Sequence, residues 1–216
     1  MKLVATADTH GALPEIEPCD ILLIGGDVCP VQGNHSIASQ KRWIRHHFAP
    51  WLADVPAKDV DWIGGNHDFV CEAGGPNWEY ALRATRPHAK YLFNEVVEIQ
   101  GLKIFGSPMT PNLRNWAFFL DDPDWRLFAD KLPDADIYLL HSPPQGILCG
   151  SHNEWGSPFM ASALYKKKPK AVICGHIHEG FGVEKIGKDE IPFYNVAYVG
   201  ELYDFGNPRP PVVIEL

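Results

Sequence analysis

Leu3-Val4-Ala5-Thr6-Ala7-Asp8-Thr9-His10 is a short apolar run that ends in a carboxylate and an imidazole. A run of this length, bounded by polar residues, is typical of a buried β-strand. A second apolar run, Ile21-Leu22-Leu23-Ile24, has the same pattern and is followed by Gly25-Gly26-Asp27. The repetition predicts buried strands whose carboxyl ends carry metal-binding side chains.

Further apolar runs alternate with helical patterns along the chain. Strands are predicted at 60–63, 103–105, 137–140 and 171–174. The clearest helix is predicted at 36–52, where apolar residues recur at spacings of three, four and seven: Ile37, Ile44, Phe48 and Trp51. Shorter helices are predicted at 76–84, 123–132 and 158–166. This alternation predicts an α/β layered protein with at least partly parallel sheets.

Three later segments, 95–99, 192–199 and 212–216, follow one another without helices and predict antiparallel additions to the sheets. No internal repeat, low-complexity tract or linker-like change in composition divides the 216 residues. A chain of this length can bury a large core without disulfides or a structural metal. We therefore expect a single domain over residues 1–216, in which any metal serves function.

The composition excludes several classes of protein. Hydrophobic residues make up 45% of the chain and charged residues 21%, as in ordinary globular proteins, which excludes disorder and coiled coil. The net charge of −8 disfavours long nucleic acid as a stable partner. The one basic run, Lys166-Lys167-Lys168-Pro169-Lys170, is short and typical of a solvated helix end. Ten histidines are the unusual count, and histidine is the commonest metal ligand.

The cysteines and the N-terminus indicate the compartment. Five cysteines without a C-x-x-C pair fit neither a full disulfide framework nor a zinc ribbon, which favours a reducing environment. The N-terminus reaches Asp8 too soon for a signal peptide, and no apolar run approaches the roughly 18 residues of a membrane span. We expect a cytoplasmic protein with no membrane partner.

Metal-ligand side chains follow five of the predicted strands. After Asp8-Thr9-His10 and Gly26-Asp27 come Gly64-Gly65-Asn66-His67-Asp68, His141-Ser142-Pro143-Pro144 and Gly175-His176-Ile177-His178. Each motif alone has an ordinary interpretation, such as a helix N-cap for Asp8 or a turn at Gly26-Asp27. Because the carboxyl ends of strands in α/β sheets meet in one crevice, the five together favour a single site.

Seven side chains of this cluster are potential donors: Asp8, His10, Asp27, Asn66, His141, His176 and His178. Zinc sites usually use four positions, so two ions that share a bridging carboxylate fit the number of donors better. Two ions about 3.5–4 Å apart can activate a water and clamp both reacting oxygens of a phosphoryl group. The donor set therefore predicts phosphoester hydrolysis. A serine nucleophile elbow, G-x-S-x-G, and a complete phosphate loop, G-x-x-x-x-G-K-[ST], are both absent from the sequence.

The ordered motifs resemble the calcineurin-like metallophosphoesterase superfamily over positions 8 to 178. Segments 106–111, 141–144, 175–182 and 207–211 are also similar to the metallophosphoesterase-domain-containing phosphodiesterases first known from brain. The resemblance implies a four-layer αββα sandwich, in which two mixed β-sheets are flanked by helices. It also implies two metal sites bridged by Asp27: Asp8, His10 and His178 hold one ion, and Asn66, His141 and His176 hold the other.

The resemblance implies catalytic roles as well. His67 would sit over the phosphate and stabilise the transition state or protonate the leaving oxygen, while Asp68 orients and charges its ring. Substrate contacts are expected from Asn66, His67, Arg114 and Trp116, where the last two could touch a phosphate or stack a base. The cofactors would be two divalent ions, Mn²⁺ first, with Fe, Zn, Co or Ni as alternatives.

The expected activity is hydrolysis of small phosphodiesters by in-line attack of metal-bound hydroxide, with cyclic nucleotides as leading candidates. A phosphomonoesterase or an exonuclease with the same metals is the alternative, as is a catalytically silent scaffold, which would typically lack His67 or a ligand. The second motif continues Gly26-Asp27-Val28-Cys29, without the acidic or aromatic features that some branches carry, so the choice of substrate stays open.

Overall fold

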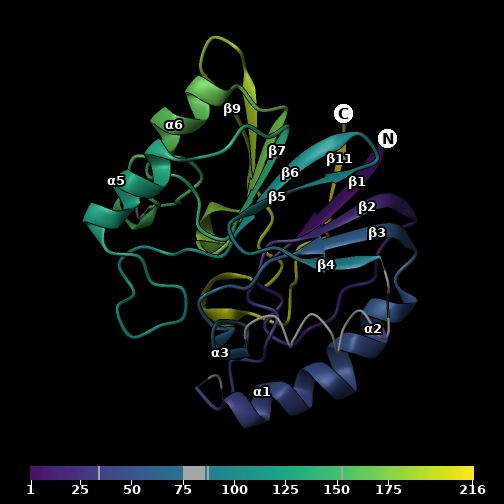
Figure 1. Ribbon diagram of the computed structural model, residues 1–216. Helices are drawn as coiled ribbons and strands as arrows, with labels where there is room; N and C mark the ends of the chain where they lie inside the picture. The colour runs from purple at the N-terminus through teal and green to yellow at the C-terminus, as the bar shows by residue number, and fades with distance from the viewer. Residues whose placement is uncertain (34, 75–85, 87, 152) are drawn as a thin grey trace.

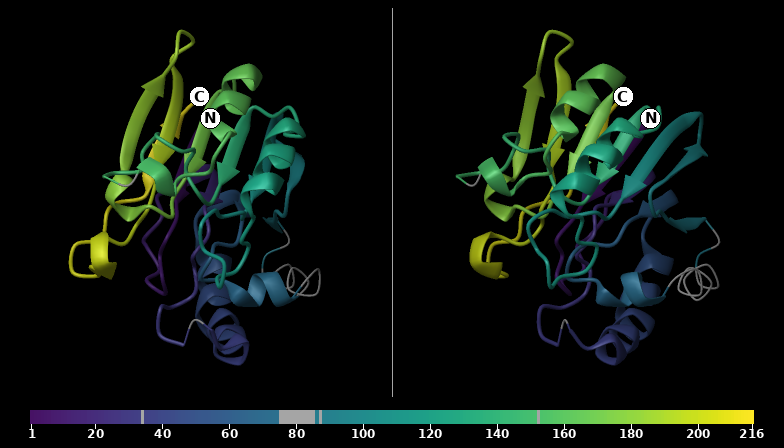
Figure 2. Two further views of the ribbon diagram at one scale, coloured as in Figure 1. Left: turned by 90° about the vertical axis from the view of Figure 1, so that its left-hand side faces the viewer. Right: turned by 60° about the vertical axis from the view of Figure 1, so that its left-hand side comes forward.

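Two β-sheets lie face to face, with helices on their outer sides (Figures 1 and 2). The computed structural model describes residues 1–33, 35–74, 86, 88–151 and 153–216. The first sheet has five strands in the order β11-β1-β2-β3-β4: Val212–Glu215, Lys2–Thr6, Cys19–Ile24, Ala57–Trp62 and Ala89–Tyr91. Its strands are parallel except β11, which pairs antiparallel with β1 and places the two ends of the chain side by side.

The second sheet has six strands in the order β5-β6-β7-β8-β10-β9: Glu95–Ile99, Leu102–Ser107, Ile137–Leu140, Ala171–Cys174, Ile191–Asn195 and Gly182–Ile186. The central strands β6, β7, β8 and β10 are parallel, whereas both edge strands are antiparallel to their neighbours. Both sheets are therefore mixed.

The alternation of side chains along each strand explains the layers. In β2, Ile21 and Leu23 belong to the core between the two sheets, whereas Leu22 and Ile24 belong to the core under the helices of the first sheet. Strand β7 repeats the pattern, with its odd-numbered residues between the sheets and its even-numbered residues under the helices of the second sheet. Strands buried on both faces read as continuous apolar runs. The predicted four-layer αββα sandwich of two mixed sheets is confirmed.

The predicted helix 36–52 is present in three joined parts. Helix α1 (Ile37–Trp43) begins at Ser36, a π-helical stretch covers Ile44–Phe48, and α2 (Ala49–Asp54) follows. The N–H of Ala49 donates to the carbonyl of Ile44, five residues earlier. Pro50 stands at the start of α2. A proline removes a helical N–H and crowds the carbonyl four residues before it, which accounts for the widened turns ahead of it.

The other described helices are α3 (Phe69–Gly74), α5 (Asp122–Asp130) and α6 (Met160–Lys167). Helices α5 and α6 correspond to the predicted helices 123–132 and 158–166 and cover the outer face of the second sheet (Figure 1). The six-residue α3 was not predicted, and the predicted helix 76–84 lies outside the described residues. Among the described residues, no helix combines the length and apolar character needed to cross a bilayer.

The prediction of antiparallel additions is right for β5 and β11 and right only in part for 192–199, whose strand β10 is antiparallel to β9 alone. Strand β10 runs parallel to β8, and the antiparallel edge strand is β9, which the sequence did not indicate. After β8 the chain forms the edge strand β9, which runs antiparallel to β8. The hairpin at Gly187 then reverses the chain, and β10 lies between β8 and β9. The five cysteines are all buried and free.

One junction joins the two sheets near the site. The N–H of Ala7, just after β1, donates to the carbonyl of Val196 at 3.0 Å, and the N–H of Tyr198 donates back to the carbonyl of Ala7 at 2.8 Å. This junction brings the carboxyl ends of the central strands of both sheets to one place.

Candidate metal centre

Backbone hydrogen bonds hold the loops after the central strands together. The N–H groups of Asp8 and His10, after β1, donate to the carbonyls of Gly26 and Asp27, after β2, each at 2.9 Å. In the second sheet, the N–H of Gly175, after β8, donates to the carbonyl of His141, after β7, at 2.9 Å. The polar side chains that follow these strands therefore start from fixed positions.

Strained backbone occurs in these loops. Four of the candidate ligands have left-handed φ angles: Asp8 (52°), His10 (45°), Asp27 (53°) and His176 (66°). Non-glycine residues rarely adopt this conformation, and such strain clusters at functional sites.

Two glycines make room for the cluster. A Cβ at Gly65 would collide with the Asp27 carboxylate and the His141 ring, and a Cβ at Gly175 would collide with the Asp8 carboxylate. Any larger residue at either position would displace a candidate ligand.

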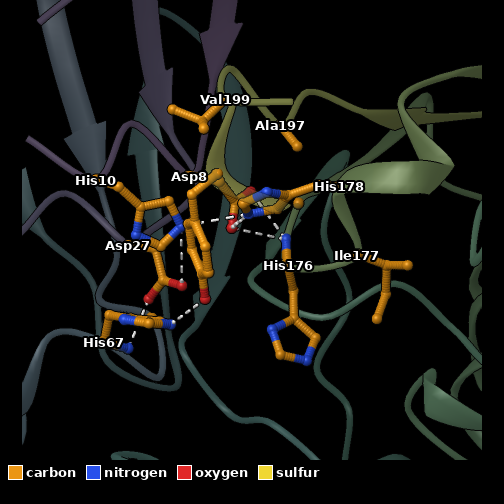
Figure 3. A network of polar contacts seen from close by, with 12 residues as sticks. Asp8, His10, Asp27, His67, His176, Ile177, His178, Ala197 and Val199 are labelled. Atoms are coloured by element: carbon orange, nitrogen blue, oxygen red, sulfur yellow. Dashed lines mark hydrogen bonds and ion pairs between the residues drawn. The ribbon is translucent and has the colours of Figure 1, made fainter. Parts of the chain in front are cut away.

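Asp8, His10 and His178 form one group, whose potential ligand atoms all lie within 4.8 Å of one another. The Nε2 atoms of His10 and His178 are 3.2 Å apart, and His178 Nε2 is 3.5 Å from Asp8 Oδ1. Figure 3 shows the side chains gathered in the centre of the site.

Asp27, His141 and His176 form a second group with the same 4.8 Å limit. His141 Nε2 lies 3.5 Å from Asp27 Oδ2 and 3.0 Å from Asn66 Oδ1. The Oδ2 atom of Asp27 also lies 3.8 Å from His10 Nε2, in the first group. Asp27 is therefore positioned between the two groups.

The hydrogen bonds of two histidines show that the donor set suits a cation. The Nδ1–H of His141 donates to the Gly25 carbonyl at 2.7 Å, and that of His178 donates to the Gly200 carbonyl at 3.0 Å. In a neutral imidazole the other nitrogen, Nε2, then carries only a lone pair. Both Nε2 atoms face a carboxylate oxygen, which is also an acceptor, and a cation between them resolves this contact.

The charges in the site agree with this interpretation. Burial lowers the pKa of His10 to about 4 and that of His176 to about 3, which keeps both rings in the neutral form that binds metal. Burial opposes ionisation of Asp27, but the charges of His141 and His67 outweigh it and lower its pKa well below the ordinary value. Burial also opposes charge on His141, yet Asp27 and Asp8 raise its pKa to about 9, so positive charge is favoured beside Asp27.

His67 lies against the first group and makes contacts through three of its atoms. Its backbone N–H donates to Asp27 Oδ1 at 2.7 Å, its carbonyl accepts from the amide of Gln40, and its Nε2 lies 3.1 Å from the hydroxyl of Tyr203. Burial lowers the pKa of His67, which favours the neutral ring.

Asp68 ties loops together. Its carboxylate accepts hydrogen bonds from the backbone N–H groups of Val28, Cys29 and Gly65 at 3.2, 2.9 and 2.9 Å. Burial raises its pKa to about 6, although these amides oppose the rise. The expected role of Asp68 in orienting the His67 ring stays a prediction.

The two expected substrate contacts outside the motifs lie in different places. The ring of Trp116 is 4.4 Å from that of His67, centroid to centroid, so Trp116 lies beside the site. The exposed guanidinium of Arg114 pairs with Asp121 at 3.4 Å and lies over the ring of Phe119. The structure therefore brings Trp116 to His67, whereas the described contacts of Arg114 are on the surface.

Sequence reasoning missed four residues that support the cluster: Gln40, Asn195, Tyr203 and Arg209. The buried amide of Asn195 donates to the carbonyls of Leu148, Gly175 and Ile177. Arg209 donates to the His178 carbonyl at 2.7 Å, from the proline-rich segment before β11. That segment, 207–211, stands out in the sequence for its resemblance to known phosphodiesterases, but the other three residues lie outside any recognisable motif.

Two mixed sheets with carboxylates and imidazoles at the carboxyl ends of their strands define a class of layered metallohydrolase. Comparison with known proteins agrees. The family model described as calcineurin-like phosphoesterase matches residues 1–180. The chain therefore belongs to the calcineurin-like phosphoesterase family, whose members are metal-dependent phosphoesterases.

Relatives with curated sequences match along the whole chain. UPF0046 protein T07D4.2 of Caenorhabditis elegans is 26% identical over 250 residues, and human metallophosphoesterase domain-containing protein 1 is 25% identical over 250 residues. Both matches cover 100% of this chain, which spans 60% of the worm protein and 71% of the human protein.

A solved structure of TT1561 from Thermus thermophilus has a TM-score of 0.56 and is 17% identical, over 90% of this chain and 88% of that chain. A solved archaeal phosphodiesterase has a TM-score of 0.52 and is also 17% identical, over 100% of this chain and 93% of that chain. At this identity the two structures establish the fold alone.

Proposed function

We propose that this chain is a metal-dependent phosphodiesterase with two metal ions, which hydrolyses small phosphodiesters, with cyclic nucleotides as candidates. The carboxylate of Asp27 carries the proposal, because it lies between the two ligand groups. Asp8, His10 and His178 would hold one ion, and Asn66, His141 and His176 the other. A single ion would leave one of these groups of buried acceptors without a cation.

Two divalent ions bound here would neutralise the charge of a phosphoryl group and activate a water for in-line attack. Mn²⁺ is our first choice, since mixed nitrogen and oxygen ligands suit it, with Fe, Zn, Co or Ni as alternatives.

The chain's own residues would bind the ester and move a proton. His67 Nε2 is the group placed to donate a hydrogen bond to the phosphoryl group or a proton to the leaving oxygen, and the bond from its N–H to Asp27 fixes its backbone beside the ligands. Trp116 packs on the ring of His67 and offers an apolar face to the ester group. The buried position of His67 beside the rings of Trp116 and Tyr203 favours a small ester over a long polymer.

Family membership and the names of similar proteins support the same reaction. The family is one of phosphoesterases, the human relative is named a metallophosphoesterase domain-containing protein, and one fold neighbour is a phosphodiesterase. A phosphomonoesterase or an exonuclease would use the same donors.

Turnover of bis(p-nitrophenyl) phosphate by the purified protein, assayed separately with Mn²⁺, Co²⁺, Ni²⁺ and Zn²⁺, tests the proposal. We expect about two ions per chain by metal analysis, and faster hydrolysis of the diester than of p-nitrophenyl phosphate or single-stranded DNA. Asp27→Ala should lose bound metal and at least the roughly 10–100-fold in activity that loss of a supporting group costs. Asp54→Ala, at the exposed end of α2, is the matched control. Absence of turnover with every metal, or full activity in Asp27→Ala, would overturn the proposal.

A further inference from the structure

Tyr203 reaches into the site from a surface turn between β10 and β11. Its hydroxyl lies 3.1 Å from His67 Nε2. Its ring is 4.9 Å from the ring of His10 and 5.5 Å from that of His178, edge-on to both. Tyr203 therefore covers the first ligand group. Its hydroxyl is also hydrogen-bonded to Nε2 of His67, the atom that would contact the substrate in the proposed function.

The base of this turn is anchored. The Gly200 carbonyl accepts from His178 Nδ1 at 3.0 Å, and its N–H donates to the carbonyl of Asp204 at 3.2 Å. Arg209 donates to the carbonyls of both His178 and Val199. The position of the base is thus tied to a candidate metal ligand.

The tip of the turn is strained and uncovered. Leu202 and Tyr203 have successive left-handed φ angles of 53° and 58°, which non-glycine residues rarely adopt. The side chain of Leu202 is 99% exposed, and that of Tyr203 is 39% exposed. The bond to His67 and the ring contacts of Tyr203 therefore hold this tip against its own backbone preference.

The geometry leads to competition for one atom. A neutral imidazole has a single hydrogen or a single lone pair at Nε2, so this atom makes one good hydrogen bond at a time. Trp116 already packs against the ring of His67. A leaving-group oxygen can therefore reach Nε2 only by replacing the Tyr203 hydroxyl.

We propose that Tyr203 is a specificity-determining residue on the leaving-group side of the site, which the ester displaces from His67 when it binds. The proposal rests on the proposed function, in which His67 serves the leaving oxygen. The phenol marks the position of that oxygen, and its ring fills the space that the group attached to the oxygen needs. Outward movement of the tip relieves the strain at Leu202 and Tyr203, which favours the exchange.

Binding of non-hydrolysable phosphonates to the metal-loaded protein, measured by calorimetry, tests the displacement. Tyr203→Phe removes only the hydroxyl and should tighten phenylphosphonate binding about two- to tenfold, the worth of one hydrogen bond. Tyr203→Ala also removes the ring and should tighten binding of phenylphosphonate more than that of methylphosphonate. Leu202→Asn suits the left-handed tip, so it should stabilise the covered state and weaken binding about two- to fivefold.

Steady-state kinetics on bis(p-nitrophenyl) phosphate give a second signature. KM should fall in Tyr203→Phe and rise in Leu202→Asn while kcat stays the same in both, because the reaction occurs after displacement. Tyr165→Phe, on the outer helix α6, is the matched control and should change neither constant. A lower kcat in Tyr203→Phe at unchanged KM, or affinities that move together in the two variants, would overturn the proposal.

A third measurement needs neither metal nor turnover. Diethyl pyrocarbonate modifies accessible neutral imidazoles, and mass spectrometry of the peptides locates the product. In the metal-free protein, His67 should react fastest in Tyr203→Phe, slower in the wild type and slowest in Leu202→Asn. This order without hydrolysis of any ester would overturn the proposed function and support the displaceable contact, whereas equal rates would overturn the contact itself.

Discussion

Hydrogen bonds to the backbone of His67 hold this residue where the proposed acid–base role needs it. Its N–H and carbonyl are fixed by Asp27 and Gln40, so the backbone cannot drift away from the ligands. Burial keeps the ring neutral, and the same ring is 4.7 Å from that of His10. Because Asp27, His10 and His67 also lie within 4.8 Å of one another, His67 itself is a geometric candidate for a ligand. In the proposed function, His67 instead donates a hydrogen bond or a proton to the ester.

His67→Ala distinguishes the two roles. We expect the variant to keep its full metal content and to lose about 10²–10⁴-fold in kcat, the usual contribution of a positioned acid or base. Metal analysis and diester turnover on the same sample check this. His46→Ala, an exposed histidine of the π-helical stretch, should match the wild type. Loss of one ion from His67→Ala would make His67 a ligand and contradict the assignment.

The candidate donors could be predicted from the sequence because each follows an apolar strand in a recognisable motif. Tyr203 could not, because 136 residues separate it from His67 and nothing beside it in the chain marks it. The partners of Gln40 are likewise found only in the fold. Arg114 shows the converse, since its place near the motifs suggested a site residue, while its described contacts are with Asp121 and Phe119.

At the scale of elements, helix α1 supports the loop that carries His67. Gln40 is buried on the inner face of α1. Its amide donates to the carbonyl of His67, and its oxygen accepts from the N–H of Val70, at the start of α3, at 2.8 Å. One side chain thus links α1 with both the loop that carries His67 and α3.

Gln40→Ala should weaken this link. The change removes the two hydrogen bonds that Gln40 makes to buried backbone groups, which should lower the free energy of unfolding by about 1–3 kcal/mol. Urea unfolding followed by circular dichroism checks the loss. Lys41→Ala, exposed on the same helix, should unfold near the wild-type urea concentration. Equal midpoints for the two variants would show that Gln40 does not support the loop.

The elements that the sequence predicted are those with a strong local pattern. Strands β1, β2, β7 and β8 are buried on both faces and appear as apolar runs. Strand β9 is mostly exposed, and β4 has only three residues, so neither produces such a run. The π-helical stretch was hidden for another reason, since its apolar spacing is that of an ordinary helix and the distortion arises from Pro50. The single domain and cytoplasmic location stay predictions.

At the scale of the whole molecule, the net charge is −8, and part of the acidic charge lies in the interior. Four aspartates are buried: Asp8, Asp27, Asp61 and Asp68. Asp8 and Asp27 face the imidazoles and the proposed metals, and Asp68 accepts three backbone N–H groups. Neither oxygen of Asp61 has a hydrogen-bond partner among the described residues. Asp61 is therefore the buried acid that the fold does not compensate.

Asp61 should make the stability of the whole protein depend on pH. It pairs in register with Leu23, on the face of the first sheet that meets the second sheet, and burial raises its pKa to about 7, although Lys90 opposes the rise. In the unfolded chain an aspartate has a pKa of about 3.9. Between these values the folded state binds more protons, so the free energy of unfolding falls as pH rises, and above pH 7 the full cost is present.

Asp61→Asn removes that charge while keeping the shape of the side chain. We expect the variant to be more stable than the wild type at pH 8, by on the order of 4 kcal/mol, and nearly equal to it at pH 4, where Asp61 is neutral in the folded state. Urea unfolding curves across this range check the difference. Asp59 lies on the same face of β3 but is hydrogen-bonded to Gln100, so Asp59→Asn should not become more stable than the wild type at pH 8. A stability difference independent of pH, or a less stable Asp61→Asn at pH 8, would mean that the carboxylate of Asp61 is satisfied in the folded protein.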